Sequence, residues 1–396
     1  MAGIAHRPNQ CKGSDVPVYG GFALVAEPLV RRLRWAYKLY VLNATLKEMF
    51  EFGSLDVRPI PLFKTICARG AYFLKHSARI GRAERRCDDC PMFAKGPMKD
   101  DIESAGPQRS LPPSSPGAAA ALAAAAFGAA PGMHPLPAAH DVEQRWHRAV
   151  ALGGQGRYAA ARAELSRLRR EVGPTGAWAS LVASTEASLL RQLGGHRVAA
   201  ASDGRALAAV GTEAASHGDP ENRIRCVRAR CDALTGLAAD SLGTGGLAAS
   251  RDLLTRCTAV LDEAEDADGD APFLRQRIRL AWVSAETALA GGDFSTARVF
   301  ADRAAALASR YGSVRHTIKS DLIRAASLTG DADSEPAREL AREVFDRCAE
   351  HGLIPLRWAA AMMLAGVGDS PEAVAAVNAC AATIVRRGGR FVPMGV

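Results

Sequence analysis

Apolar residues between positions 138 and 390 recur every three or four residues, the spacing that places side chains on one face of an α-helix. A glycine returns within this pattern at intervals of about 40 residues, mostly followed by a bulky residue two positions on and a small residue five positions on. These glycines are Gly156, Gly195, Gly245, Gly292 and Gly368. Such self-similarity predicts a stack of helical hairpins, each of which buries its apolar face against its neighbours.

The first unit has the parts that a helical hairpin needs. One helical face consists of Trp146, Ala149, Val150 and Leu152. The glycines between positions 153 and 156 tolerate positive φ and are expected to end this helix. A second face consists of Tyr158, Ala161, Leu165 and Leu168, and Gly173-Pro174 then stops the helix.

The composition favours the same fold class. Hydrophobic residues make up 48% of the 396 residues, alanine and leucine dominate them, and aromatic residues contribute only 6%. Few β-branched runs alternate with the period of two that a half-buried strand requires. We therefore predict an all-α protein whose residues 138–390 form an α-solenoid of about six hairpins.

The N-terminal part differs from this repeat region. Residues 1–110 are predicted to be a poorly patterned basic extension, and residues 111–137 a Pro/Ala-rich linker too poor in large apolar groups to form a core. Seven of the eight lysines precede residue 133, and only Lys319 follows it. The change in lysine usage and the position of Met133 lead to the hypothesis that the natural protein starts there. The alternative is a genuine N-terminal extension.

The positive charge lies mostly outside the repeats. Residues 1–132 hold 18 Lys and Arg residues against 11 Asp and Glu residues, whereas residues 133–396 hold 32 against 31. The net charge of +8 therefore says little about the repeat region, which is close to neutral. This balance argues against direct nucleic-acid binding by the repeats, although Arg386, Arg387 and Arg390 keep it as a minor alternative.

The repeat residues resemble the tetratricopeptide repeat (TPR) family, whose signature includes Gly-x-Tyr-x-x-Ala-x-x-x-Phe-x-x-Ala and a closing proline. Residues 156–174 match this signature best and residues 292–304 next, whereas the copies at 195, 245 and 368 are degenerate. A sixth copy near Gly330 is interrupted by Asp331–Pro336. The observed spacing exceeds the family's repeat of about 34 residues, which indicates longer helices or loop insertions. Irregular versions of this kind resemble the sensor and interaction domains attached to bacterial regulators.

Three tryptophans, Trp146, Trp282 and Trp358, lie ten residues before the glycine of their unit. The resemblance implies that the first helix of each unit lines a concave groove, with its signature tryptophan packed inward eleven residues before the glycine. A shift of one residue is about 100° around a helix, so these rings either face the groove or stay in the core. The candidate partner-binding groove consists of Trp146, Arg279, Trp282, Glu286, His316, Lys319, Arg357 and Trp358.

Other motifs do not support catalysis, a cofactor or a metal. The Gly243–Ala248 stretch fits a dinucleotide fingerprint but follows a predicted helix rather than a strand, so we expect a hairpin turn. The acidic run Asp262–Asp270 would place Ala264 at the first ligand position of a calcium loop, so we expect a solvated loop. Cys87 and Cys90 form only half of a zinc site. We predict no enzyme, no cofactor and no metal.

The expected function is therefore a non-enzymatic scaffold that binds a protein or peptide in its concave groove, as an adaptor or regulatory factor. The alternative is a sensor domain that binds a small molecule or signalling peptide and controls a transcription regulator. The nine scattered cysteines are typical of a reducing compartment. The sequence shows no apolar run long enough to span a membrane and no secretory signal, so we expect a cytoplasmic protein without a membrane partner.

Overall fold

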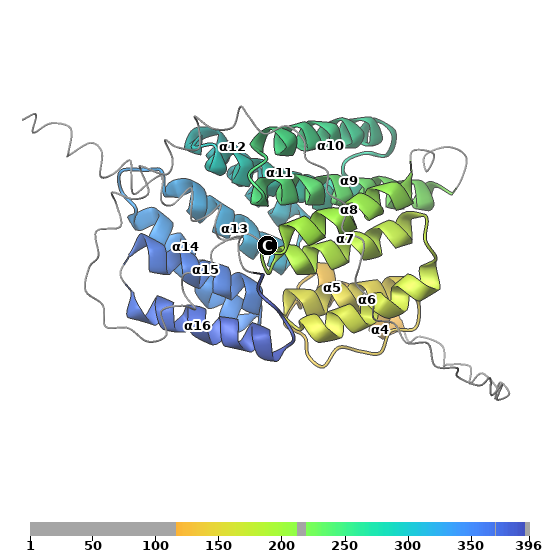
Figure 1. Cartoon of the computed structure of the whole chain (residues 1–396), viewed down its shortest axis with the longest axis horizontal. Helices are drawn as coiled ribbons and strands as arrows, with labels where there is room; N and C mark the ends of the chain where they lie inside the picture. The colour runs from red at the N-terminus through yellow and green to blue at the C-terminus, as the bar shows by residue number, and fades with distance from the viewer. Residues whose placement is uncertain (1–115, 212–218, 369, 393–396) are drawn as a thin grey trace, which may run out of the picture. The chain divides into compact units, whose positions relative to one another are not determined.

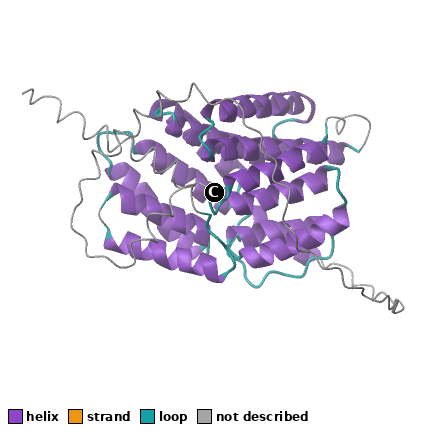
Figure 2. Ribbon diagram, viewed as in Figure 1, coloured by secondary structure: helices purple, strands orange, loops and turns teal. Residues whose placement is uncertain are grey.

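The computed structural model describes residues 116–211, 219–368 and 370–392, and every regular element in these ranges is a helix. The fold class predicted from the sequence, all-α, is therefore confirmed for this part of the chain (Figures 1 and 2). The α-helices are α4 (Pro116–Phe127), α5 (Val142–Gly154), α6 (Tyr158–Val172), α7 (Ala177–Arg191), α8 (His196–Val210), α9 (Pro220–Gly243), α10 (Leu247–Asp268), α11 (Leu274–Ala290), α12 (Phe294–Tyr311), α13 (Val314–Leu328), α14 (Glu335–Glu350), α15 (Ile354–Val367) and α16 (Pro371–Arg386). A short 3₁₀ helix, Ala271–Phe273, precedes α11.

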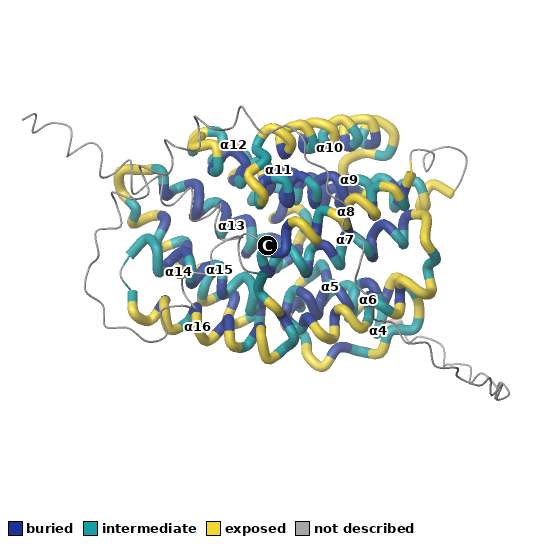
Figure 3. The backbone as a smooth tube through the Cα atoms, viewed as in Figure 1, coloured by how far each residue is buried: buried dark blue, intermediate teal, exposed yellow. Residues whose placement is uncertain are grey.

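From α5 onward the helices pack in consecutive pairs, and each odd-numbered helix also contacts the next odd-numbered one. The two helices of a pair bury different amounts of surface. In α11, 12 of 17 residues are buried, on nearly all sides of the helix. In α12 only a stripe of alanines at three- and four-residue spacing is buried, from Ala297 to Ala308. Figure 3 shows the exposed outer faces of α10, α12 and α16. The odd-numbered helices thus form an inner layer and the even-numbered helices an outer one.

The last helix pair returns to the first. Helix α15 contacts α5, and the backbone N–H of Ala159 donates to the carbonyl of Arg387 at 3.0 Å. The Arg387 guanidinium donates to the carbonyl of Gln155 at 2.7 Å. Farther along, the N–H of Val392 donates to the carbonyl of Leu193 at 2.8 Å. The inner layer therefore closes on itself, and the concave side that was predicted as a groove is bordered by both the first and the last helix pair.

Part of the predicted linker is a packed helix. Residues 116–127 form α4, which packs on α5 and buries Leu122 completely. Alanine has the highest intrinsic helix propensity, and its small side chain lets two helix backbones approach closely. The Gln155 amide then holds the following segment by donating to the carbonyls of Pro131 and Met133, both at 2.9 Å. A chain starting at Met133 would lack α4; the predicted extension, residues 1–110, lies outside the described residues.

The repeated glycines have different physical roles. Gly156 and Gly292 adopt φ values of 73° and 78°, which L side chains rarely adopt, at the turn within a helix pair. Gly330 instead leaves space for a neighbouring side chain, because a Cβ there would lie 2.4 Å from the Phe294 ring. Gly368 has an extended backbone with φ of −153°, which any residue adopts. The repeated glycine is therefore required by turn geometry in some units and by close packing in another.

Replacing Ala297 by Leu is expected to lower the free energy of unfolding by about 1–3 kcal/mol. Ala297 is fully buried and packs with Ala288, Leu289 and Ala326, so three extra carbons force these neighbours apart. The measurement is the urea midpoint and slope of the full chain. Val299→Leu is the control, since Val299 is 67% exposed on the same helix and should leave the midpoint unchanged. Equal midpoints for both variants would contradict the close packing of α12 on its neighbours.

Within the described residues, no helix combines the length and the apolar character needed to cross a lipid bilayer.

Candidate functional site

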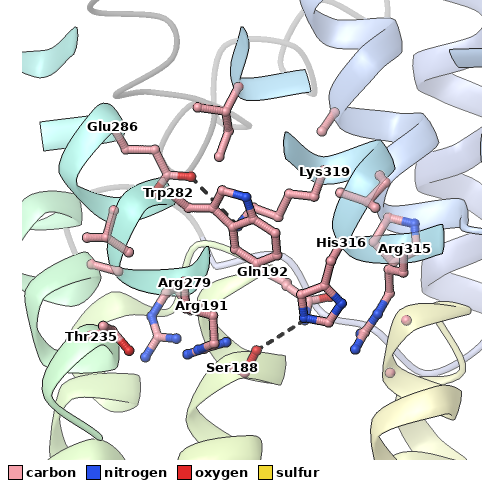
Figure 4. Close-up of a pocket in the computed structure, with 18 of the residues that line it drawn as sticks. Ser188, Arg191, Gln192, Thr235, Arg279, Trp282, Glu286, Arg315, His316 and Lys319 are labelled. Atoms are coloured by element: carbon pink, nitrogen blue, oxygen red, sulfur yellow. Dashed lines mark hydrogen bonds and ion pairs between the residues drawn. The ribbon is translucent and has the colours of Figure 1, made fainter. Parts of the chain in front are cut away.

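The inner layer encloses a pocket of about 310 Å³. Its wall is formed by α4, α5, α7, α9, α11, α13 and α15, so each inner helix of every pair contributes to it. Local periodicity explains the contributions. On α11, Arg275, Arg279, Trp282 and Glu286 follow one another at spacings of four, three and four residues and therefore share a face. On α13, Arg315 and Lys319 are related in the same way. Figure 4 shows Arg279 and Trp282 of α11 and Arg315 and Lys319 of α13 around one space.

Seven of the eight residues predicted for the groove line this pocket. They are Trp146, Arg279, Trp282, Glu286, His316, Lys319 and Trp358. The eighth, Arg357, is not part of the lining, and its guanidinium lies 4.5 Å from the centre of the Phe345 ring. Neighbouring residues on a helix point about 100° apart, and here Trp358 points to the pocket whereas Arg357 points to Phe345.

The three tryptophans line the pocket and are also packed, with exposed fractions of 8% for Trp146 and 6% for Trp282 and Trp358. Trp146 Nε1 donates to Thr185 Oγ1 at 3.0 Å, and Trp282 Nε1 donates to Ser320 Oγ at 2.9 Å. Trp358 Nε1 is buried and has no partner among the described residues. The two orientations considered for these rings, core and groove, are therefore not exclusive in this structure.

One wall of the pocket is a stack of aromatic rings. Trp282 and His316 lie with ring centroids 5.2 Å apart and planes inclined by 20°. Lys319 Nζ lies 4.5 Å from the centre of the Trp282 ring. His316 Nδ1 is 2.8 Å from Ser313 Oγ. Burial and then the charge of Arg315 lower the pKa of His316 well below its ordinary value, so the imidazole is neutral at pH 7.

Positive side chains outnumber carboxylates on the pocket wall. The lining contains five cationic residues, which are Arg191, Arg275, Arg279, Arg315 and Lys319. It contains two carboxylates, Asp232 and Glu286. Asp232 accepts from Arg275 at 2.5 Å and lies 3.1 Å from Arg279 Nε, so one carboxylate serves two guanidinium groups. Glu286 lies 3.7 Å from Lys319 Nζ.

Arg191 is held by a buried acidic pair behind the wall. Its guanidinium donates to Asp240 at 2.7 and 3.1 Å and also pairs with Asp203. His196 Nδ1 lies 3.2 Å from the same Asp240 carboxylate. Gly236 makes room for this group, since a Cβ there would lie 2.1 Å from Asp203 Oδ2. Burial, opposed by Arg191, raises the pKa of Asp203 to about 7.

Arg315 is the cation with the weakest compensation. It donates to the carbonyl of Ala126 at 3.0 Å, but it makes no ion pair with a carboxylate in the described part of the chain. Burial, followed by the charges of Arg275 and Arg279, lowers its pKa to about 10. Burial is also the main cause of the lowered pKa of Arg279 and of Lys319. The wall therefore carries more positive charge than its own carboxylates neutralise.

Arg191, Arg275, Arg315 and Asp232 were not among the predicted site residues. A signal for two of them was present, because Arg275 precedes Arg279 by four residues and Arg315 precedes Lys319 by four. No local signal marks Asp232, whose role depends on the neighbouring helix α11.

Of the other sequence motifs, the glycine stretch reaches the pocket lining through Gly243, and the acidic run does not. Gly243 ends α9 and the following glycines form the turn into α10, with a helix before the turn as expected. The acidic run was expected to be a loop, which is wrong for most of it: up to Asp268 it is the end of helix α10, and Asp262 and Glu265 pair with Arg277. No group of three or more His, Cys, Asp or Glu side chains in the described ranges could hold a metal ion. Cys87 and Cys90 lie outside those ranges.

Comparison with the sequence profiles of known protein families, with curated protein sequences and with solved structures finds no match for this chain. The function of the pocket therefore has to be argued from its own geometry, and the tetratricopeptide resemblance stays a prediction.

The stability of the protein is expected to fall as the pH drops below about 6.5, in part because of His316. The folded chain holds this imidazole neutral, whereas the unfolded chain takes up a proton near its ordinary pKa. The stabilisation is therefore complete above that pH and is lost progressively below it. Urea unfolding at pH 7 and pH 5.5, compared between the wild type and His316→Gln, measures the effect as a smaller pH dependence in the variant.

Asp203 contributes to the pH dependence of stability with the opposite sign. Because its pKa is raised to about 7, the folded chain keeps a proton that the unfolded chain has already lost, and stability falls as the pH rises toward 7. This contribution is common to the wild type and to His316→Gln, so it cancels in the comparison. The same pH dependence in both proteins would contradict a neutral, buried His316.

Proposed function

We propose that this chain is a non-enzymatic binding protein in which six tetratricopeptide-like hairpins, α5/α6 to α15/α16, enclose a ligand in the central pocket. The observation that carries the proposal is the convergence of side chains from every inner helix on one cavity. A hairpin stack that served only as a spacer would not need arginines, tryptophans and a neutral histidine on its innermost surface. Aromatic and arginine side chains are those that most often anchor bound partners.

The size of the cavity favours a small ligand over a folded protein partner. A volume of about 310 Å³ lies at the lower end of the range for small-molecule sites, about 300–1,000 Å³. The contacts between the first and last helix pairs close the surface along which a long partner segment would lie. Of the two functions expected from the sequence, these features support the sensor for a small molecule or short signalling peptide rather than the groove-binding adaptor.

A ligand in this position touches helices from all six pairs and can therefore stabilise their closed arrangement. Binding that favours one arrangement of the helices shifts the population toward it, which is the requirement for a sensor that controls a transcription regulator. A cytoplasmic location is part of the proposal, and the five described cysteines, all buried and unpaired, support a reducing compartment. Direct nucleic-acid binding is not proposed, because the five lining cations face the pocket.

The test is a thermal-shift screen of the full chain against small acids, nucleotides and short peptides, with a variant that fills the pocket. Ala359 lines the cavity, so Ala359→Phe places a ring inside it. Ala160→Phe is the control, since Ala160 is exposed on the outer helix α6. A ligand should raise the melting temperature of the wild type and of Ala160→Phe but not of Ala359→Phe. Equal shifts in all three proteins would place binding outside the pocket.

A further inference from the structure

We infer that the ligand is a compact organic anion, a carboxylate or phosphate on a small planar body, whose charged group lies between Arg279 and Arg315 and whose body lies against Trp282. This inference rests on the proposed function and adds the chemical class of the ligand. It depends on three observations: the charge balance of the wall, the buried donors on lining residues that have no hydrogen-bond partner in the described structure, and the aromatic side of the pocket.

The charge balance leaves positive charge unneutralised. Among the described residues five cations line the pocket, and two lining carboxylates together with Asp203 and Asp240 behind Arg191 supply at most four negative charges, because the raised pKa of Asp203 leaves it partly protonated at pH 7. One of these carboxylates, Asp232, is shared between Arg275 and Arg279. In a partly enclosed site the interaction between charges is several times stronger than in water, so an anion entering this space gains attraction that solvent screens little.

Arg315 is the clearest part of this excess. Its guanidinium is repelled by Arg275 and Arg279 and has no carboxylate partner in the described ranges. A cation kept in such a position lowers stability unless an anion joins it, and side chains of this kind concentrate at functional sites. In Figure 4 the guanidinium groups of Arg191 and Arg279 and that of Arg315 border the same space from α7, α11 and α13.

The donors on the wall fit an oxyanion. A guanidinium presents N–H groups in a planar fork that matches the two oxygens of a carboxylate or the oxygens of a phosphate. Arg279 Nε is buried and donates a hydrogen bond to no acceptor in the described structure, although Asp232 lies within ion-pair distance. Trp358 Nε1, on a residue 6% exposed, is a second donor without a partner that belongs to the lining. Both donors belong to side chains that line the cavity.

The same wall also has an aromatic and apolar part. Trp282 and His316, stacked on each other and with Lys319 Nζ 4.5 Å from the Trp282 ring centre, form an aromatic face of the cavity, and Val283 and Leu322 add apolar side chains to the lining. A planar body attached to the anionic group can pack on this face, as aromatic groups do at separations of about 4.5–7 Å. A purely inorganic anion would leave this apolar part of the pocket unused, and a neutral planar ligand would leave the charge excess in place.

The experiment uses three probes that share a phenyl ring on the full chain. Benzoate and its neutral counterpart benzamide test the charge, and phenyl phosphate tests the phosphate source of the same chemistry. Calorimetric titration should show benzoate or phenyl phosphate binding at least about ten-fold more tightly than benzamide, the effect of one well-placed ionic contact. The tighter of the two anions identifies whether the natural ligand is a carboxylate or a phosphate.

Two variants test the assigned side chains, and a third variant serves as the control. Arg315→Gln and Arg279→Gln should each weaken anion binding by about ten-fold and leave benzamide binding unchanged. Because Arg315 has no carboxylate partner among the described residues, Arg315→Gln should keep the melting temperature within about 2 °C of the wild type or raise it, which separates lost binding from misfolding. Arg256→Gln should change neither property, since Arg256 is exposed on the outer helix α10.

Three results would overturn the inference. They are equal affinity for the three probes, anion affinity unchanged by both variants, and no saturable anion binding up to about 20 mM. Benzamide binding that is as tight as benzoate binding and is abolished by Ala359→Phe would reject the anionic ligand while leaving the proposed function standing. Anion binding unaffected by Ala359→Phe would reject the pocket itself and the proposed function with it.

Discussion

Replacing Trp282 by Ala is expected to lower the free energy of unfolding by about 3–5 kcal/mol and to abolish ligand binding in the pocket. The ring is 6% exposed, stacks on His316 at 5.2 Å and donates to Ser320 Oγ at 2.9 Å. Its removal leaves a cavity that the surrounding helices α11 and α13 can fill only in part. Urea unfolding of the full chain, followed by circular dichroism, measures the first effect, and the thermal-shift screen measures the second.

Trp282→Phe separates the two contributions of the ring. Phenylalanine keeps an aromatic face against His316 but cannot donate to Ser320, so it should cost about 1–2 kcal/mol. Trp178→Ala is the matched control, because Trp178 is only half-buried and is not part of the pocket lining. This variant should lose less stability and keep ligand binding. A stability loss below about 1 kcal/mol for Trp282→Ala would contradict the packing described for this wall.

Trp282 illustrates which features of this fold can be predicted from the sequence and which cannot. The helical period and the glycine positions predicted the hairpin pattern, since both depend on residues that are close in the chain. The one-residue offset of the tryptophans left two orientations open, core and groove. Core and groove were treated as alternatives because an open solenoid separates these two surfaces. In this closed arrangement the inner face of α11 is both packed interior and pocket wall.

Closure itself depends on contacts that no local pattern contains. The hydrogen bonds of Ala159 and Gln155 to Arg387 join residues more than 220 positions apart in the chain. The role of α4 was missed for a related reason. An alanine-rich segment has no strong hydrophobic pattern, and its burial depends on the neighbouring surface of α5. Composition therefore indicated a linker where tertiary packing forms a helix.

The buried acidic pair behind Arg191 was equally invisible, because Asp203 and Asp240 come from different helices and show no charge pattern of their own. Replacing Asp240 by Ala is expected to lower the free energy of unfolding by about 3–5 kcal/mol. The carboxylate is almost fully buried, and it accepts two hydrogen bonds from Arg191 and lies 3.2 Å from His196 Nδ1. Its loss leaves the Arg191 guanidinium only partly paired in a site with little water.

An exposed ion pair provides the control for this experiment. Asp331 pairs with Arg298 at 2.7 Å, and both side chains are at least 40% exposed, so Asp331→Ala should cost less than about 1 kcal/mol. The difference between the two variants, read from urea midpoints at constant slope, measures the effect of burial on an arginine–aspartate contact. Because Arg191 also lines the pocket, Asp240→Ala should change anion affinity as well. Similar small losses for both variants would show that solvent reaches Arg191 and would weaken the case for an enclosed, positively charged site.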